Sequence, residues 1–130
     1  MEKRDPGPGL LEKANLLVAR LISGQGDLAQ ALRGASHGPL TFEANGVVIV
    51  LDIRHMDSGH ASLMGQIAAE DQDLWMDTPV DLHKNNQVQT STRLDDLGAF
   101  RYENILPGPY ELRIGPRKGS TIVIMFEVPI

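Results

Sequence analysis

The sequence contains no cysteine, and this absence sets the first limits on what the protein can do. Without cysteine there is no disulfide bond, no thiolate metal site and no thiol redox chemistry. Long apolar runs are also missing, because a run such as Val47 to Leu51 is far too short to cross a bilayer. Residues 1–9 are polar and carry no apolar signal-peptide core. We therefore expect a disordered lead-in over residues 1–9 and a cytoplasmic protein.

Positive charge is also in short supply. Twelve Lys and Arg residues face seventeen Asp and Glu residues, which gives a formal net charge of −5. This balance argues against binding nucleic acid broadly through its phosphates. The one local group of cations, Arg113, Arg117 and Lys118, is interpreted as a solvated strand end and turn. We expect neither nucleic acid nor a membrane as a partner.

Apolar residues at helical spacing, among them Leu17 and Leu21, fill residues 10–22. Two glycines follow and end such a helix. Residues 27–32 begin with the pattern of a capping box, which predicts a second short helix. Residues 10–37 are therefore predicted to form a helical arm. The arm either packs on its own domain or provides a docking or homodimerisation surface for a protein partner.

The rest of the chain has the patterns of β-structure. Residues 40–44 and 47–54 flank an Asn-Gly pair, which suits a two-residue type I′ turn because both positions need a positive φ. Further alternating segments lead to an apolar last strand at residues 121–128, which should be central or covered on both faces. We expect residues 38–130 to form a seven- to eight-stranded antiparallel two-sheet sandwich. Its expected core is Leu63, Ile67, Phe100, Tyr102, Tyr110, Leu112, Ile114, Ile122, Ile124 and Phe126.

Two neighbouring motifs point to a particular sandwich. An acidic turn precedes GAFRY at residues 98–102, and LPGPYEL follows at residues 106–112. With SLMGQI at residues 62–67 and TPVDL at residues 78–82, they resemble the carboxypeptidase regulatory-like domain, a transthyretin-like (prealbumin-like) fold. The resemblance implies the fold and no single activity, because this sandwich hosts many roles. The Tyr-Arg-Gly-Ser signature of the related hydrolases of urate breakdown is absent, so that activity is not expected.

The N-terminal half carries a second resemblance. LVARLI at residues 17–22, ALRG at residues 31–34 and LDIR at residues 51–54 occur in an order similar to that of bacterial proteins encoded beside extracytoplasmic-function sigma factors. In those proteins a helix, a linker and a hairpin precede a carboxypeptidase regulatory-like sandwich. The resemblance implies a cytoplasmic accessory or regulatory protein that acts near a sigma factor or its zinc-binding anti-sigma partner. The Cys and His cluster of such anti-sigma factors is absent here.

Histidine and aspartate offer one candidate metal site. His55 and His60 flank a tight turn together with Asp52 and Asp57, and two histidines with one aspartate are a reasonable ligand set for zinc. Asp-Ser-Gly at residues 57–59 is a common turn sequence, however, so a turn accounts for these residues without a metal. We interpret these histidines as solvated and predict no metal.

The acidic residues offer no better case for chemistry. Asp71, Asp73 and Asp77 could supply oxygen ligands to calcium, but their spacing lacks the glycine and distal glutamate of an EF-hand loop. Asp95 and Asp96 precede a glycine and are interpreted as turn residues rather than as an acid–base pair. We predict no catalytic residue and no cofactor.

Two features remain as candidate binding elements. Trp75, the only tryptophan, lies in an acidic loop and is expected to fold back over an open end of the sandwich, although an exposed ring could stack on a sugar or anchor a partner. Residues 87–92, which include Gln87 and Gln89, are polar and predict an edge strand.

The expected function is therefore a non-catalytic protein-interaction or regulatory domain. The candidate contacts are Leu17 and Leu21 on the arm, Trp75 on its loop, and Gln87 and Gln89 on the edge strand. The alternative is a carbohydrate-binding module that stacks a sugar on Trp75.

Overall fold

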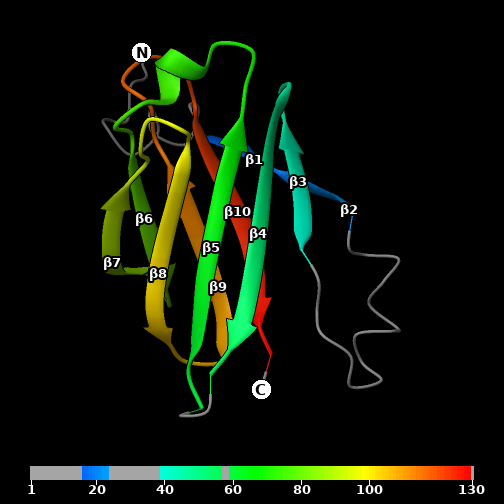
Figure 1. Ribbon diagram of the computed structural model, residues 1–130, viewed down its shortest axis with the longest axis vertical. Helices are drawn as coiled ribbons and strands as arrows, with labels where there is room; N and C mark the ends of the chain where they lie inside the picture. The colour runs from blue at the N-terminus through cyan, green and yellow to red at the C-terminus, as the bar shows by residue number, and fades with distance from the viewer. Residues whose placement is uncertain (1–15, 24–38, 57–58, 130) are drawn as a thin grey trace, which may run out of the picture.

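A computed structural model describes residues 16–23, 39–56 and 59–129. Ten strands in these ranges form two five-stranded sheets packed face to face as a sandwich (Figure 1). One sheet has the order β1-β10-β9-β6-β7 and the other β2-β3-β4-β5-β8. The strands are β1 (Leu16–Val18), β2 (Arg20–Ser23), β3 (Leu40–Ala44), β4 (Val47–His55), β5 (Ala61–Ala68), β6 (Pro79–Lys84), β7 (Gln87–Arg93), β8 (Ala99–Ile105), β9 (Gly108–Ile114) and β10 (Thr121–Val128).

The predicted β-sandwich is confirmed, with three differences. Eight strands, β3 to β10, follow residue 38 as the upper count expected, and β1 and β2 add two more. Neighbouring strands run antiparallel except β1, which pairs in parallel with β10. No α-helix occurs in the described ranges, where the only helical element is the 3-10 turn η1 (Gln72–Trp75).

The predicted N-terminal helix is wrong for residues 16–23, which form β1 and β2 instead. In this segment Leu17, Ala19 and Leu21 are buried or half-buried, whereas Val18 and Ile22 are exposed. Burial at every second residue is the period of a strand. Because the two exposed residues are also apolar, the sequence alone favoured a helix. Residues 10–15, the rest of the predicted arm at residues 24–37 and the predicted lead-in at residues 1–9 lie outside the described residues.

β1 and β2 join the two sheets along one side of the sandwich. β1 adds to β10 with Leu17 opposite Ile122, and β2 adds to β3 with Leu21 opposite Phe42. Ala19 lies between them and donates its N–H to the carbonyl of Val123 at 2.8 Å. A continuous segment therefore passes from one sheet to the other, and the two leucines extend the core on that side (Figure 1).

The β3–β4 hairpin has the predicted turn. Asn45 and Gly46 adopt φ values of 51° and 84°, and Ala44 lies opposite Val47. The N–H of Gly46 donates to Glu43 at 2.9 Å, and the Arg20 guanidinium binds the same carboxylate. These contacts hold the pKa of the Glu43 carboxyl below its usual range.

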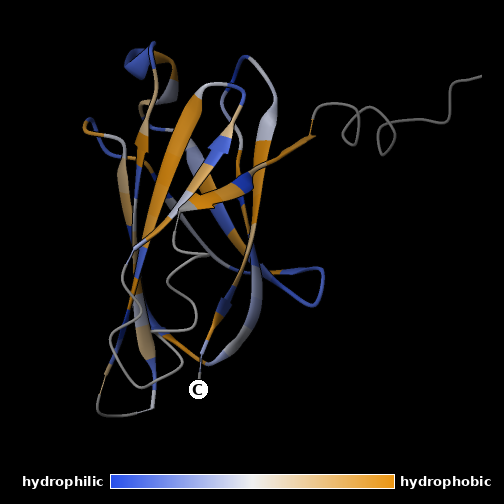
Figure 2. Cartoon of the chain, turned by 90° about the vertical axis from the view of Figure 1, so that its right-hand side faces the viewer, coloured by the Kyte–Doolittle hydropathy of each residue, from blue (hydrophilic) through white to orange (hydrophobic). Residues whose placement is uncertain are grey.

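The core lies between the sheets, and the sequence placed its residues correctly. All ten predicted core residues are buried, and four of them (Leu63, Leu112, Ile114 and Ile124) have no exposed surface. β10 lies between β1 and β9, so the last strand is central as expected. Buried residues recur at every second position along much of β9, and Figure 2 shows how apolar and polar residues are distributed over the strands.

Two tyrosine hydroxyls hold the sandwich together through backbone carbonyls. Tyr102, on β8 of one sheet, donates to the carbonyl of Val80 on β6 of the other sheet. Tyr110 donates to the carbonyl of Leu106 at 2.7 Å, and its ring stacks on Phe126 at 5.8 Å. Of these two bonds, the one from Tyr102 joins the two sheets.

We expect Tyr102→Phe to lower the free energy of unfolding by about 1–2 kcal/mol at neutral pH, because it leaves the buried Val80 carbonyl without this donor. Burial, and then the charge of Asp81, raise the pKa of the Tyr102 phenol. The fold therefore disfavours the phenolate, and the stability gained from Tyr102 is lost as pH rises above the unfolded value of about 10. Urea unfolding at pH 7 and above pH 10 measures both effects.

Tyr110→Phe is the matched control, since it also removes one hydroxyl bonded to a carbonyl. The Tyr102→Phe protein should lose less stability at alkaline pH than the wild type. If the Tyr102→Phe protein and the wild type lost the same stability above pH 10, Tyr102 would not be the group responsible.

Candidate functional site

β7 forms a long free edge of the first sheet, as residues 87–92 predicted. Gln87 and Gln89 are exposed on it, and every residue of the strand except the half-buried Thr92 is exposed. The strand pairs on one side with β6, and its other side has no partner within the described residues. Its backbone groups on that side are therefore available to another strand.

The other sheet edges carry features that discourage pairing. β1 has three residues and β2 has four, so each offers little backbone. β8 carries an ion pair between Arg101 and Glu103 at 2.9 Å, and its register with β5 shifts near Ala61. β7 is seven residues long, and its only charged residue is Arg93 at the end. Among the described edges, β7 is the one that remains long and uncharged.

The inner face of β7 is also open. Thr90 lies opposite Leu82, which is fully buried, yet Thr90 itself is exposed. The second sheet therefore does not extend over this part of β7. Val88, whose side chain is 53% exposed, lies opposite His83, next to a register irregularity. A strand added beside β7 would find room for side chains on both faces.

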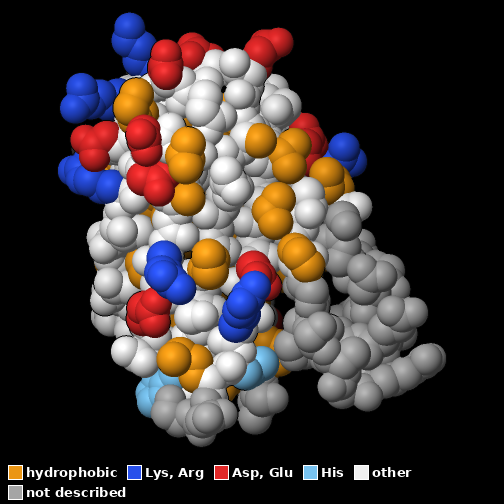
Figure 3. Space-filling view, in the orientation of Figure 1, with side chains coloured by type: hydrophobic (Ala, Val, Ile, Leu, Met, Phe, Trp, Pro, Cys, Tyr) orange, Lys and Arg blue, Asp and Glu red, His pale blue; other side chains and the backbone are white. Residues whose placement is uncertain are grey.

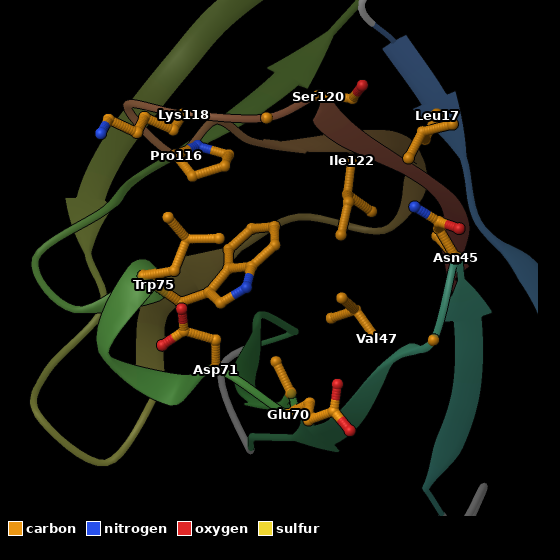
Figure 4. A pocket seen from close by; sticks show the side chains of 15 residues that line it. Leu17, Asn45, Val47, Glu70, Asp71, Trp75, Pro116, Lys118, Ser120 and Ile122 are labelled. Carbon is orange, nitrogen blue, oxygen red and sulfur yellow. The ribbon is translucent and has the colours of Figure 1, made fainter.

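Trp75 covers one end of the sandwich, as expected. It ends η1 and is only 5% exposed, so its ring does not stand on the outer surface as a platform for a sugar. The carbohydrate alternative depended on an exposed ring, and this burial removes that support. Trp75 also lines a pocket of ≈ 510 Å³ between the ends of the two sheets. In Figure 4 its ring extends into the pocket toward Ile122 and Val47.

The pocket is built from segments that are far apart in the sequence. Leu17 of β1, the Asn45 turn, Val47 of β4, η1 and the β9–β10 loop all contribute to its lining. Leu17 and Trp75 were both candidate contacts in the sequence, but Leu17 was predicted to lie on a helix. Nothing in the sequence indicated that the two residues would line one pocket. No local pattern signals such a pocket, because each wall residue reads by itself as an ordinary core or turn position.

Leu17 and Leu21, which were predicted as contacts on a helical arm, lie on strands in the structure. Leu17 and Leu21 are half-buried and pack against the core from β1 and β2. They do not share the face of a helix, and most of their apolar surface is used within the chain. Of the three candidate binding elements, β7 is the most exposed.

The polar candidates are engaged in turns or spread over the surface. Asp95 accepts hydrogen bonds from the N–H groups of Leu97 and Ala99, both at 2.9 Å, and so acts as a turn residue. No group of three or more His, Cys, Asp or Glu side chains within the described ranges could hold a metal ion. Asp57, one member of the candidate histidine site that was weighed and not favoured, lies outside those ranges.

The outer face of the second sheet is mixed rather than apolar. Met64 is exposed there, and two ion pairs cross the same face: Arg54 with Asp52 at 3.1 Å, and Arg101 with Glu103. Figure 3 shows apolar side chains on this face separated by charged ones. This arrangement is typical of a solvated surface. No helix in the described part of the chain is long and apolar enough to span a membrane.

Comparison with protein-family models, with curated proteins and with solved structures finds no match to this chain. The geometry of the sandwich, above all that of β7, is therefore the main guide to a function.

Proposed function

We propose that this protein is a non-catalytic protein-interaction and regulatory domain that binds an extended segment of a partner along β7. The observation that carries the proposal is the contrast between β7 and the other edges. β7 is seven residues long, leaves one side of its backbone unpaired and has one terminal charge, whereas the other edges are short or charged. Backbone hydrogen bonds would supply the affinity, and side chains at alternate positions the specificity.

The finer assignment comes from the sequence resemblances. A carboxypeptidase regulatory-like domain in a cytoplasmic accessory protein of sigma-factor signalling agrees with a binding role. The partner segment would then belong to a sigma factor or its anti-sigma partner. The two-sheet architecture supports the sandwich part of this proposal.

The side chains of β7 define the partner's chemistry. Gln87 and Gln89 are uncharged hydrogen-bonding groups, and Val88 gives one apolar contact. The Ser91 hydroxyl already donates to Asp81 of β6 at 2.7 Å. Such a surface favours an uncharged, β-branched strand over a strongly acidic or basic one. We therefore expect peptides rich in Thr, Val and Ile to bind here.

A test uses random twelve-residue peptides displayed on phage and selected on the full chain. Selected peptides are then made synthetically, and their dissociation constants are measured by fluorescence polarisation. Successive residues of a strand direct their N–H groups to opposite sides, so Thr90→Pro and Ser91→Pro form a matched pair. One removes an N–H that faces the partner, and the other removes an N–H that faces β6.

The variant that keeps its thermal stability identifies the outward-facing N–H. That variant should bind the peptides at least about tenfold more weakly, a loss of about 1.4 kcal/mol. The proposal fails if no peptide is enriched, or if the stable proline variant binds the enriched peptides as tightly as the wild type.

A further inference from the structure

The strongest unexplained feature of the sandwich is the indole N–H of Trp75. Trp75 is only 5% exposed. Within the described part of the chain, its Nε1–H donates no hydrogen bond. A buried indole N–H usually has an acceptor, because leaving such a donor unsatisfied is costly. Figure 4 shows the nitrogen on the side of the ring that faces Val47 across the pocket.

The pocket around this N–H has the dimensions of a small-molecule site. Its volume of ≈ 510 Å³ lies within the range of roughly 300–1,000 Å³ typical of ligand pockets. The apolar part of its wall comes from both sheets, with Leu17, Val47, Ile122 and the Trp75 ring, and Asn45 and Ser120 add polar groups. A site of this kind binds an apolar body and orients it with a few polar groups.

Charge at the mouth restricts the ligand further. Glu70 and Asp71 line the lower rim in Figure 4 and are exposed. Lys118 also lines the pocket, but its side chain points away from the centre. A negatively charged ligand would therefore approach two carboxylates without a facing cation. The carboxylates disfavour an anion, and the apolar walls disfavour a cation that would have to lose its water, so the pocket is suited to a neutral molecule.

From this geometry we infer that the end of the sandwich is a binding site for a small uncharged aromatic molecule whose hydrogen-bond acceptor meets the Trp75 N–H. This site is separate from β7 and does not depend on the protein-interaction role. The apolar walls would hold the ring, and the Trp75 N–H would fix its direction.

The test uses the full chain labelled with ¹⁵N. Trp75 is the only tryptophan, so the ¹H–¹⁵N spectrum contains one indole cross-peak. Three probes of similar size are titrated at neutral pH: acetophenone, which is neutral and has an acceptor; ethylbenzene, which lacks the acceptor; and benzoate, which is negatively charged. The rest of the spectrum reports whether the protein stays folded.

Acetophenone should shift the indole cross-peak to saturation, with an affinity at least about tenfold higher than that of either other probe. Equal binding of acetophenone and ethylbenzene would overturn the role of the N–H. Equal binding of benzoate would overturn the charge argument. The absence of a saturable shift in a folded protein would overturn the proposed binding site.

Two variants at neighbouring positions of β4 locate the site. Val47→Phe fills the pocket, into which Val47 points in Figure 4. Val48→Phe is the matched control, because Val48 follows on the opposite face of the strand. Val47→Phe should abolish the acetophenone shift and Val48→Phe should keep it. Retention of the shift in both variants would place any binding outside this pocket.

Discussion

Gly98→Ala should lower the free energy of unfolding by about 2–5 kcal/mol. Two separate costs arise at this position. Gly98 has a φ of +79°, a left-handed conformation that costs a residue with a side chain about 1–2 kcal/mol. A Cβ there would also lie 2.7 Å from the carbonyl oxygen of Ile67, and crowding of this kind typically costs about 1–3 kcal/mol.

The crowding cannot be relieved easily, because the turn is held from three directions. The Gly98 carbonyl accepts from the N–H of Ile67 at 2.8 Å, which joins the turn to β5. Its N–H donates to the carbonyl of Asp95 at 3.0 Å. Gln72, in η1, donates to the Ile67 carbonyl at 2.9 Å and lies against the same space. Moving the turn away from the new methyl group would break these bonds.

Gly46→Ala separates the two costs. Gly46 has a similar φ of +84°, but a Cβ there would meet nothing within 4 Å. This variant should therefore lose only the conformational part, about 1–2 kcal/mol. Chemical denaturation of the two variants and the wild type gives the comparison. If Gly98→Ala were no more destabilising than Gly46→Ala, the steric part of the argument would be wrong.

The strands after residue 38 were predictable because their signals are local. Alternation fixes which face of a strand is buried, and Asn45-Gly46 selects its own turn type. The edge position of β7 was also predictable, since a run of polar residues such as 87–92 could not have been covered on both faces. These inferences need no knowledge of distant parts of the chain.

The N-terminal strands and the pocket were not predictable in the same way. Val18 and Ile22 are apolar although they point outward, so the period of two through Leu17, Ala19 and Leu21 was hidden. The pairing of β1 with β10 joins residues about a hundred positions apart, which only the folded topology reveals.

The burial of Trp75 was expected, but the cavity beside it was not. The walls come from β1, β4, η1 and the end of β10, so the cavity exists only when these segments are assembled. The same assembly leaves the indole N–H without an acceptor among the described residues. A sequence pattern can place an aromatic residue at the end of a sandwich, but it cannot show whether the space around the ring is filled.

The second large effect concerns Gly65, which lies opposite Phe100 in the β5–β8 pair. The Phe100 ring occupies the place where a side chain would stand: a Cβ on Gly65 would lie 2.8 Å from one ring carbon and closer to two others. Gly65→Ala should therefore cost about 1–3 kcal/mol, because the buried ring must leave its position. Phe100 also packs edge-on to Tyr102 at 6.1 Å, so its displacement would disturb the residue that links the two sheets.

A double-mutant cycle with Phe100→Leu tests whether the ring is the cause. Phe100→Leu alone should destabilise the protein, since it removes buried aromatic surface. In that background the ring is gone, and Gly65→Ala should be neutral or stabilising by about 0.5–1 kcal/mol, because glycine is a poor strand residue. The expected coupling is about 1–3 kcal/mol, measured by chemical denaturation of all four proteins. Additive losses would instead show that glycine is required by the backbone at this position. Coupled losses would show that Gly65 is there to make room for Phe100, and through Phe100 to keep Tyr102 in place between the sheets.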